Sequence, residues 1–434
     1  MACNYLRPTI IVGSCFALLA AFQGSAVAQT PEPRLDTSQL YADVHFHASN
    51  YAMQGIPLKE YAQRYMSADR QQIIRSTIMP IPLQQRWDGF EEYQAQGPNN
   101  QMFGPNYYIG SKADLYYYSF IDAMFAREYE RLEPQYQEKL DVMITAFNPM
   151  DVYASQHIKR AVLSFPGVFS GVGEFTIHKE LVSSKLAGET VEETKAPSVP
   201  LPPDAGDGSK VSLYSESLEY LFKTIEEVGL VAILHNDMYR VEVNYKGELE
   251  HAYPNQDYVN GLKHVCGHAP NAKVVWAHTG LGRFVKPTSD HITRVKKVLD
   301  ACPSWSTDIS WDLVQDYMLD PEPGMPSRQD WLNFFKEYQN RILWGSDVVI
   351  FTRNRFESNP PTSVTPGSLM QPAQYHADLS KMKDFLDELP VAIGNKIRHE
   401  NYVRLFNRAK FSVRAWEREN ADLNIWDIPT PVHP

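Results

Sequence analysis

The sequence predicts an α/β fold, a (β/α)8 TIM barrel with insertions after the second and fourth strands. Short apolar runs rich in Val and Ile recur along the chain, amphipathic segments separate them, and histidines or carboxylates follow several of the runs. This alternation is typical of βα units around a parallel sheet, and eight units suggest a barrel whose active site lies at the C-terminal ends of the strands. The expected strands are Leu40–His45, Ile73–Met79, Leu140–Ala146, Val168–Phe175, Leu230–Leu234, Lys273–Ala277, Trp305–Ile309 and Ile342–Trp344.

The amphipathic segments are expected to form the outer ring of helices. Each carries apolar residues three or four positions apart, and this spacing places them on one face of a helix. The expected helices are Leu58–Ala68, Val152–Ser164, Leu213–Val228, Tyr258–Val265, His291–Ala301, Trp331–Tyr338 and Leu379–Glu388.

Two stretches depart from a bare barrel. Residues 82–139 hold a Gln/Asn/Gly-rich segment and an expected long helix at about Ala113–Leu140. We predict that this insertion is a cap or lid, with a structural cap or dimer surface as the alternative. Residues 188–210 are rich in Pro, Ser, Gly and acidic residues, so we predict a flexible surface loop there.

The N-terminal segment, residues 1–28, is predicted to be a signal peptide. Arg7 supplies a positive charge, Ile10–Phe22 is apolar, and Ala26-Val27-Ala28 is a small-residue cleavage signature. We therefore expect an exported protein of the periplasm or the extracellular space, with residues 29–434 forming a single domain. No later stretch approaches the roughly 20 apolar residues of a membrane span, so no membrane contact is expected after cleavage.

Composition limits the partners. The 434 residues carry 41 Lys and Arg against 52 Asp and Glu, so we expect a small-molecule substrate and no nucleic acid. A homo-oligomer stays open. Only Cys266 and Cys302 remain after the predicted cleavage, and either a disulfide or two buried thiols would fit an exported chain.

Residues at the C-terminal ends of the strands carry the chemistry. His45 and His47 alternate along the first strand, so both imidazoles project from one face, as a transition-metal site requires. Four further residues of metal-ligand type follow other strands: Glu174, His235, His278 and Asp347. A strand-end carboxylate often only caps the next helix, and a strand-end histidine is often only hydrogen-bonded. Their occurrence at five strand ends together predicts a site for one or two divalent metal ions, and zinc is the expected metal.

The sequence resembles the amidohydrolase superfamily over nearly the whole mature chain. The segments that carry the resemblance are Asp43–His47, Gly173-Glu174, His235, Trp276–Gly280, Arg341–Asp347 and Asn401–Phe406. The last two look most like the branch that contains aminocarboxymuconate semialdehyde decarboxylase. The resemblance implies that one metal is held by His45, His47 and Asp347, and that Glu174 bridges to a second metal held by His235 and His278. Many two-metal relatives have a carboxylated lysine where this chain has Glu174, and the decarboxylase branch typically uses one metal, so the metal count stays open.

The expected reaction is hydrolysis of a small ester, lactone or amide. A divalent cation lowers the pKa of bound water to roughly 7 and polarises a carbonyl group. Asp347 is the expected proton shuttle, and with a single metal ion His278 or His235 becomes the general acid or base. One alternative is a mononuclear-metal, non-oxidative decarboxylation of an unsaturated or aromatic carboxylic acid. Another is a non-catalytic binding barrel that uses metal only for structure.

Several further residues near the strand ends are candidates for substrate binding. Arg283 ranks first among the groups that could clamp an anionic substrate, although such cations are usually only solvated. The remaining candidates are His178, Lys179, Trp311, Arg353 and Arg355. Asp43 is expected either to support a ligand histidine or to pack inside the barrel, and Asp312 either to contact substrate or to cap a helix.

Overall fold

The computed structural model describes residues 37–49, 55–66, 72–81, 95–96, 102–103, 119–179, 212–243, 249–349, 375–376 and 380–429. These residues all belong to one compact unit that begins at Thr37. The predicted signal peptide, the predicted loop at 188–210, and Arg353 and Arg355 lie outside the described residues.

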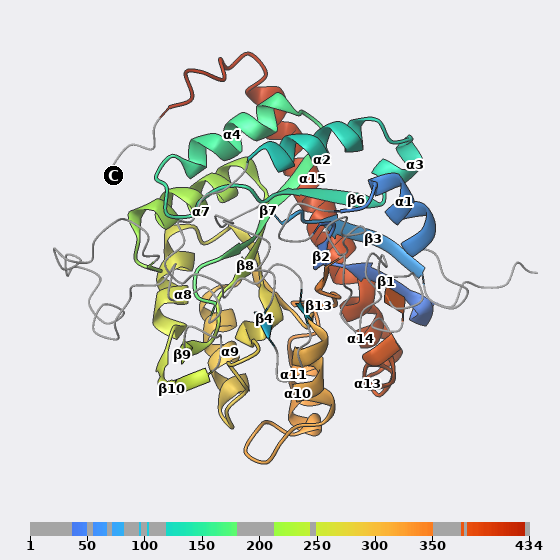
Figure 1. Cartoon of the computed structure of the whole chain (residues 1–434), viewed down its shortest axis with the longest axis vertical. Helices are drawn as coiled ribbons and strands as arrows, with labels where there is room; N and C mark the ends of the chain where they lie inside the picture. Colours follow the sequence, from blue (N-terminus) through green and yellow to red (C-terminus); the bar gives the residue numbers. More distant parts are fainter. Residues whose placement is uncertain are drawn as a thin grey trace, which may run out of the picture. The chain divides into compact units, whose positions relative to one another are not determined.

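Eight strands form one parallel sheet at the centre of this unit, with helices around it (Figure 1). Each strand overlaps an expected one, because strands buried on both faces read as nearly continuous apolar runs. In sheet order they are β1 (Leu40–Asp43), β3 (Gln72–Ile78), β6 (Leu140–Ile144), β7 (Phe169–Thr176), β8 (Val231–His235), β11 (Lys273–Trp276), β12 (Trp305–Asp308) and β13 (Ile342–Leu343). The order follows the chain, as successive βα units require.

The sheet closes into a barrel between its first and last strands. The chain after β1 continues into β2 (Phe46–His47), which pairs in parallel with β14 (Val348–Val349), the continuation of β13. The Val44 N–H also donates to the Trp344 carbonyl at 3.3 Å. The predicted (β/α)8 barrel is therefore confirmed.

Most of the expected helices are present in the outer ring. They are α1 (Leu58–Glu60), which runs into η2 (Tyr61–Tyr65), α4 (Ala154–Ser164), α7 (Glu216–Val228), α8 (Val259–His268), α9 (His291–Ala301), α11 (Arg328–Glu337) and α13 (Lys383–Asp387). Between β12 and β13 the chain forms α10 (Asp312–Leu319) in addition to α11. After α13 it continues into α14 (Val391–Asn395) and η5 (Lys396–Glu400).

The long helix expected at Ala113–Leu140 is wrong for the part of it that the structure describes. Two helices, α2 (Phe120–Glu130) and α3 (Pro134–Gln137), occupy this stretch. Proline lacks a backbone N–H and disfavours a helical residue before it, and Glu133 is accordingly extended, with φ −63° and ψ 145°. The α2 helix packs on β6 through Asp122, whose carboxylate accepts the N–H groups of Thr145 and Ala146. Residues 119–139 thus supply the ring helix between β3 and β6, and only the short strands β4 (Ala95–Gln96) and β5 (Met102–Phe103) are described in the rest of the insertion.

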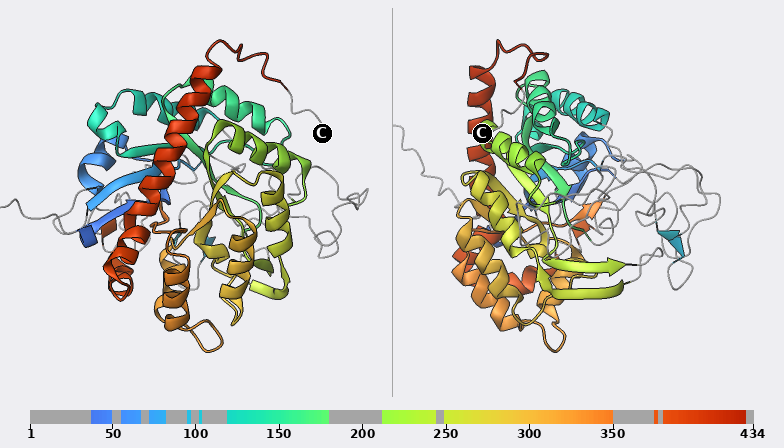
Figure 2. Two further views of the ribbon diagram at one scale, coloured as in Figure 1. Left: turned by 180° about the vertical axis from the view of Figure 1, so that it is seen from behind. Right: turned by 90° about the vertical axis from the view of Figure 1, so that its left-hand side faces the viewer.

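A helix that was not expected, α15 (Asn401–Glu419), crosses the barrel at the end opposite the expected active site (Figure 2). The Lys410 ammonium donates to the carbonyl of Leu140, and the Arg414 guanidinium donates to that of Phe169, at the beginnings of β6 and β7. Three of its side chains pack into the barrel interior, namely Tyr402, Phe406 and Ala409. In the described part of the chain, no helix combines the length and the apolarity that crossing a membrane needs.

Two further features lie outside the barrel sheet. Cys266 in α8 and Cys302 after α9 form a disulfide, which settles the alternative left open by the sequence. An antiparallel hairpin, β9 (Tyr239–Val243) and β10 (Leu249–Asp257), follows β8 and was not expected.

Candidate metal centre

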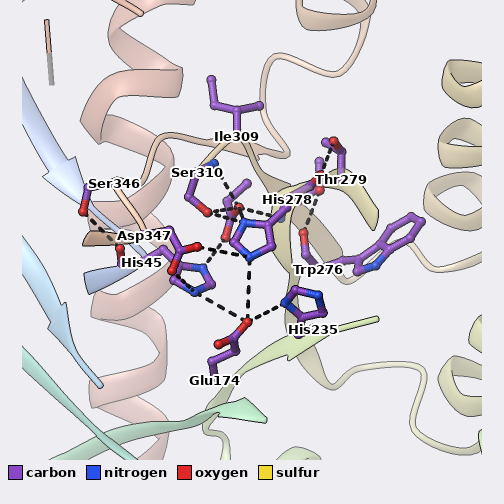
Figure 3. Close-up of polar contacts among 12 residues, drawn as sticks. His45, Glu174, His235, Trp276, His278, Thr279, Ile309, Ser310, Ser346 and Asp347 are labelled. Carbon is purple, nitrogen blue, oxygen red and sulfur yellow. Dashed lines mark hydrogen bonds and ion pairs between the residues drawn. The ribbon is translucent and has the colours of Figure 1, made fainter. Parts of the chain in front are cut away.

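The six residues of metal-ligand type converge at the C-terminal ends of the strands. Their positions are His45 between β1 and β2, His47 in β2, Glu174 in β7, His235 at the end of β8, His278 in the turn η4 (Ala277–Gly280) after β11, and Asp347 before β14. The four histidines are buried and the two carboxylates are partly buried. Figure 3 shows Glu174 and Asp347 facing a group of imidazoles that come from different strands.

One group of ligand atoms lies at the seam of the barrel. Asp347 Oδ1 is 3.1 Å from His47 Nε2 and 3.5 Å from His45 Nε2. Glu174 Oε2 is 3.5 Å from His47 Nε2. The Asp347 N–H donates to the His45 carbonyl at 2.6 Å, so the backbone itself holds the last strand's carboxylate beside the first strand's histidine.

A second group of ligand atoms lies on the other side of Glu174. Glu174 Oε1 is 2.7 Å from His235 Nδ1 and 3.8 Å from His278 Nε2. The two groups therefore share Glu174. In each of three overlapping sets, the ligand atoms lie within 4.8 Å of one another: His45, His47 and Glu174; Glu174, His235 and His278; and His45, His278 and Asp347. This arrangement offers two neighbouring positions at which a cation could be held.

Two buried nitrogen atoms indicate whether these residues are suited to bind a metal ion. His45 Nε2 and His278 Nε2 have no hydrogen-bond partner among the described residues. The opposite nitrogen of each ring is engaged: His45 Nδ1 lies 3.0 Å from Asp308 Oδ2, and His278 Nδ1 lies 2.8 Å from Ser310 Oγ. A neutral imidazole that donates through Nδ1 keeps a lone pair on Nε2, and burying that lone pair without a partner is costly. A divalent cation between these nitrogens and the carboxylates would remove that cost, so the residues fit a metal.

Charge interactions set the protonation of the cluster. Burial alone would raise the pKa of Asp347, but the facing His45 and His278 hold it well below its usual value. Burial likewise opposes ionisation of Glu174, yet Lys179 and His235 hold its pKa well below the usual value. Burial, assisted by the Lys179 charge, lowers the pKa of His235 to about 4. Near pH 7 both carboxylates are thus ionised and His235 is neutral, which are the protonation states that ligate metals. Burial opposes the charge of His45, but Asp347 and Asp308 raise its pKa well above the usual value, so a metal ion would displace a proton from this ring.

The backbone at the site adopts rarely populated conformations. His278, Thr279, Trp311 and Asp347 have φ of 56°, 54°, 72° and 55°, in the left-handed region that residues with a Cβ seldom occupy. Such strain concentrates at functional sites, where the surrounding structure enforces it. One enforcing contact comes from His291 in α9, whose Nε2 lies 3.0 Å from the Thr279 carbonyl oxygen and donates to it.

Gly173 lets β7 approach β8 closely enough to bring Glu174 to His235. A Cβ at this position would lie 2.2 Å from the Ile233 carbonyl oxygen, and the residue has φ 107°. Only glycine satisfies both conditions.

Asp308, at the end of β12, is a site residue that the sequence analysis missed. It is fully buried, and besides His45 it accepts hydrogen bonds from the His278 N–H at 2.8 Å and the Ser310 hydroxyl at 2.6 Å. The signal in the sequence is a carboxylate at the end of a barrel strand, the same signal that Glu174 gives near the end of β7.

Asp43, expected either to support a ligand histidine or to pack inside the barrel, is fully buried and bonds to the backbone of His45 rather than to its ring. Its carboxylate accepts the N–H groups of His45 and Ser346, the Ser346 hydroxyl at 2.6 Å and the Tyr375 hydroxyl at 2.7 Å. Asp43 therefore fastens the end of the first strand to the loop that carries Asp347.

The candidates for substrate binding differ in their distance from the cluster and in their exposure to solvent. Lys179 Nζ lies 3.9 Å from Glu174 Oε1 and 5.9 Å from the centroid of the Trp311 ring, which in turn packs 5.4 Å from the His278 ring. The Arg283 side chain is exposed.

Two further candidates have structural contacts. The His178 ring stacks on Tyr258 at 3.9 Å. Asp312 is exposed at the start of α10 and accepts the Leu313 N–H. Of all these candidates, the structure places Lys179 and Trp311 at the cluster, and substrate binding by any of them stays a prediction.

The fold and the site together define a (β/α)8 barrel protein with a candidate metal centre at the C-terminal ends of its strands. No family model and no curated protein matches the chain. Solved structures similar to it include dihydroorotase from Saccharomyces cerevisiae with 5-fluoroorotic acid, at 12% identity over 85% of this chain and 84% of that chain, with a TM-score of 0.42.

Two other similar structures are 2,6-dihydroxybenzoate decarboxylase from Rhizobium and an amidohydrolase from Burkholderia multivorans with bound zinc. The decarboxylase is 12% identical over 85% of this chain and 98% of that chain, with a TM-score of 0.40. The amidohydrolase is 10% identical over 85% of this chain and 99% of that chain, with a TM-score of 0.39. All three neighbours are members of the amidohydrolase superfamily, which the sequence motifs resemble. At these identities and TM-scores they carry no argument about this chain's activity, which has to come from the site.

Proposed function

We propose that the protein is a metal-dependent hydrolase of the amidohydrolase superfamily that acts on a small ester, lactone or amide. The observation that carries the proposal is the convergence of four histidines and two carboxylates from five strands, with His45 Nε2 and His278 Nε2 buried and without a hydrogen-bond partner among the described residues. Imidazole and carboxylate ligands suit zinc, which is the metal we propose.

The proposed ligand sets follow the two groups that share Glu174. One ion would be held by His45, His47 and Asp347, and the other by His235 and His278, with Glu174 between them. When bound, the ions would supply a water of lowered pKa and polarise the scissile carbonyl.

Asp347 is the residue we propose for proton transfer. Its Oδ2 faces His278 at 3.7 Å while Oδ1 faces the first-strand histidines, so one carboxylate oxygen can ligate and the other can accept a proton. The side chain is 13% exposed, which leaves it reachable from the substrate side. It would take the proton from the attacking water and deliver it to the leaving group.

Lys179 and Trp311 favour a substrate that carries a carboxylate. Among the residues that the structure describes, Lys179 places its ammonium group beside the cluster, and a substrate anion would replace part of its interaction with Glu174. The Trp311 ring, between Lys179 and His278, offers a flat apolar wall for the neighbouring part of the substrate.

The same lysine favours a second candidate function, the non-oxidative decarboxylation of an unsaturated or aromatic carboxylic acid. In that reaction His278 or His235 would handle the proton that replaces the carboxyl group. Both functions require a metal, and they differ in whether water is consumed.

We further propose that the protein is exported, with cleavage after Ala28. The Cys266–Cys302 disulfide supports this proposal, because such bonds persist in oxidising compartments and are rare in the cytosol.

The test is a paired assay on protein purified without chelator. Esters, lactones and amides, each with and without a carboxylate, are incubated in ¹⁸O-labelled water, and matched carboxylic acids are monitored for carbon dioxide release. Incorporation of one ¹⁸O atom per product, lost after metal removal and restored by zinc, would support the hydrolase. Carbon dioxide release with no ¹⁸O in the remaining organic product would replace it by the decarboxylase.

A further inference from the structure

The outer ring of the barrel carries a second cluster of metal-ligand residues, separate from the site described above. Glu219 belongs to α7, while His264 and His268 belong to α8, the next helix along the ring (Figure 1). Each of the three side chains is partly exposed. Neither helix contributes a ligand to the site at the ends of the strands.

The three polar atoms point at one another. His264 Nε2 and His268 Nε2 are 3.2 Å apart, and His268 Nε2 is 3.1 Å from Glu219 Oε1. The two rings meet edge to face, with centroids 4.5 Å apart and planes at 78°. Histidines four residues apart lie on the same face of a helix, as in helical zinc-binding motifs.

These separations match the coordination shell of zinc. A tetrahedral ion with bonds of about 2.05 Å to its ligands holds any two ligand atoms about 3.3 Å apart. Hydrogen bonding alone serves the cluster less well, because the single proton of His268 Nε2 would have to be shared between Glu219 and His264. A cation accepts a lone pair from each of the three atoms.

The chain also holds this cluster in place. Cys266 lies between the two histidines in α8, and its disulfide to Cys302 fixes this turn of the helix against the end of α9. The second carboxylate oxygen of Glu219 lies 3.9 Å from the Lys223 ammonium, which leaves Oε1 directed at His268. A site held in this way loses little conformational freedom when it binds an ion.

We propose that Glu219, His264 and His268 bind one divalent transition-metal ion of the zinc class, with water completing its coordination. The ion would tie α7 to α8 on the outside of the barrel. This proposal does not rest on the proposed enzymatic function, because it needs neither the residues at the ends of the strands nor a substrate.

The test counts zinc in the full-length protein. Chelator-treated wild type and variants are equilibrated with buffered free Zn²⁺, and bound zinc per chain is measured by elemental analysis. The His264→Ala and His268→Ala variants are expected to bind one ion fewer than wild type, and Glu219→Gln to bind this ion at least tenfold more weakly. His251→Ala, which removes an exposed histidine of β10, is the matched control and should bind as wild type does.

A second measurement uses the unmodified chain, so that it does not depend on the folding of any variant. Histidines are labelled with diethyl pyrocarbonate with and without Zn²⁺ and are located by mass spectrometry. We expect zinc to protect His264 and His268 while the exposed His251 is labelled equally in both samples. Equal zinc content in wild type and His264→Ala, or equal labelling of both residues with and without zinc, would overturn the proposal.

Discussion

His45 and Asp308 are 263 positions apart in the sequence, yet His45 Nδ1 lies 3.0 Å from Asp308 Oδ2, and both residues are fully buried. The other oxygen of the same carboxylate accepts the backbone N–H of His278. The Asp308 carboxylate therefore orients two candidate metal ligands, His45, which follows β1, and His278, which follows β11. It also fixes the tautomer of His45 that presents Nε2 to the cluster.

The first prediction concerns this carboxylate. We expect Asp308→Asn to weaken zinc affinity by about 10- to 100-fold, because partners of this kind orient the ligand histidines and raise their basicity. Competition with a chromophoric chelator measures the affinity. Asp312→Asn, at an exposed residue four positions further on, is the control and should leave the affinity unchanged. Wild-type affinity in Asp308→Asn would show that the hydrogen bond does not support the metal.

The second prediction concerns the shared ligand. We expect Glu174→Gln to bind about one zinc ion fewer than wild type, which should hold two ions at the strand ends besides the one proposed at Glu219, His264 and His268, because a neutral amide bridges two cations poorly. Elemental analysis of protein purified without chelator checks both numbers. Glu250→Gln changes an exposed glutamate of β10 in the same way and should keep the wild-type content. One ion at the strand ends in both proteins would favour the mononuclear decarboxylase.

The third prediction concerns proton transfer. We expect Asp347→Asn to reduce kcat by about 10²- to 10⁴-fold while substrate still binds, because the amide cannot accept the proton of the attacking water. Steady-state kinetics and the metal content of the same samples separate loss of the shuttle from loss of a ligand. Asp316→Asn, at an exposed residue of α10, serves as the control. Near-wild-type turnover in Asp347→Asn would remove this residue from the mechanism.

The fourth prediction distinguishes two cations. We expect Lys179→Met to raise KM for a carboxylate-bearing substrate by about tenfold or more, since a hydrogen bond to a charged group contributes about 1.5–3 kcal/mol. A neutral analogue of the substrate should show no change. Arg283→Gln should behave as wild type because that side chain is exposed. A raised KM in Arg283→Gln and an unchanged KM in Lys179→Met would instead assign binding of the substrate carboxylate to Arg283, the first candidate from the sequence.

The fifth prediction concerns stability and pH. Burial lowers the pKa of His291 from its usual 6.5 to about 3, so this residue stays neutral in the fold while the unfolded chain takes up a proton. Stability should therefore fall as the pH drops from about 6.5 towards 3, by up to about 1.4 kcal/mol per pH unit from this group, and should not depend on it above that window.

Urea unfolding at a series of pH values measures this dependence. His291→Gln keeps a donor for the Thr279 carbonyl but cannot titrate, so its stability should fall less steeply than that of wild type below pH 6.5. The exposed His251, changed to Gln, should retain the wild-type slope. Parallel slopes for wild type and His291→Gln would mean that His291 does not contribute to the acid sensitivity.

The barrel could be predicted from the sequence because its strands are buried on both faces. In β8, for example, every residue before His235 is apolar, and the helical segments between the strands show their own period. The helix α15 also leaves a signal, since Tyr402, Phe406, Ala409 and Val413 recur at helical spacing and are buried. The expected ring of helices already completes a (β/α)8 barrel without it. The need for a helix that covers the far end of the barrel arises only from tertiary packing, which a local sequence pattern does not encode.

The ligand types could be predicted because they follow strands whose ends all meet at one edge. What surrounds them could not. Asp43 and Asp308 both end strands, and only the packed structure shows that Asp308 meets an imidazole while Asp43 meets backbone N–H groups. Lys179 and Arg283 both follow strands in loops, and loop conformation, which periodicity does not encode, decides which cation reaches the cluster.

The seam of the barrel sets the order of events in biosynthesis. His45 and His47 leave the ribosome early, whereas Asp347 and its strand partner β14 are made some 300 residues later, and the hydrogen bond from Asp347 to His45 forms only when both are present. A nascent chain therefore cannot assemble the first ligand set, however much of the barrel precedes residue 347. The proposed ligand set of His45, His47 and Asp347 is therefore complete only after nearly the whole polypeptide has been made.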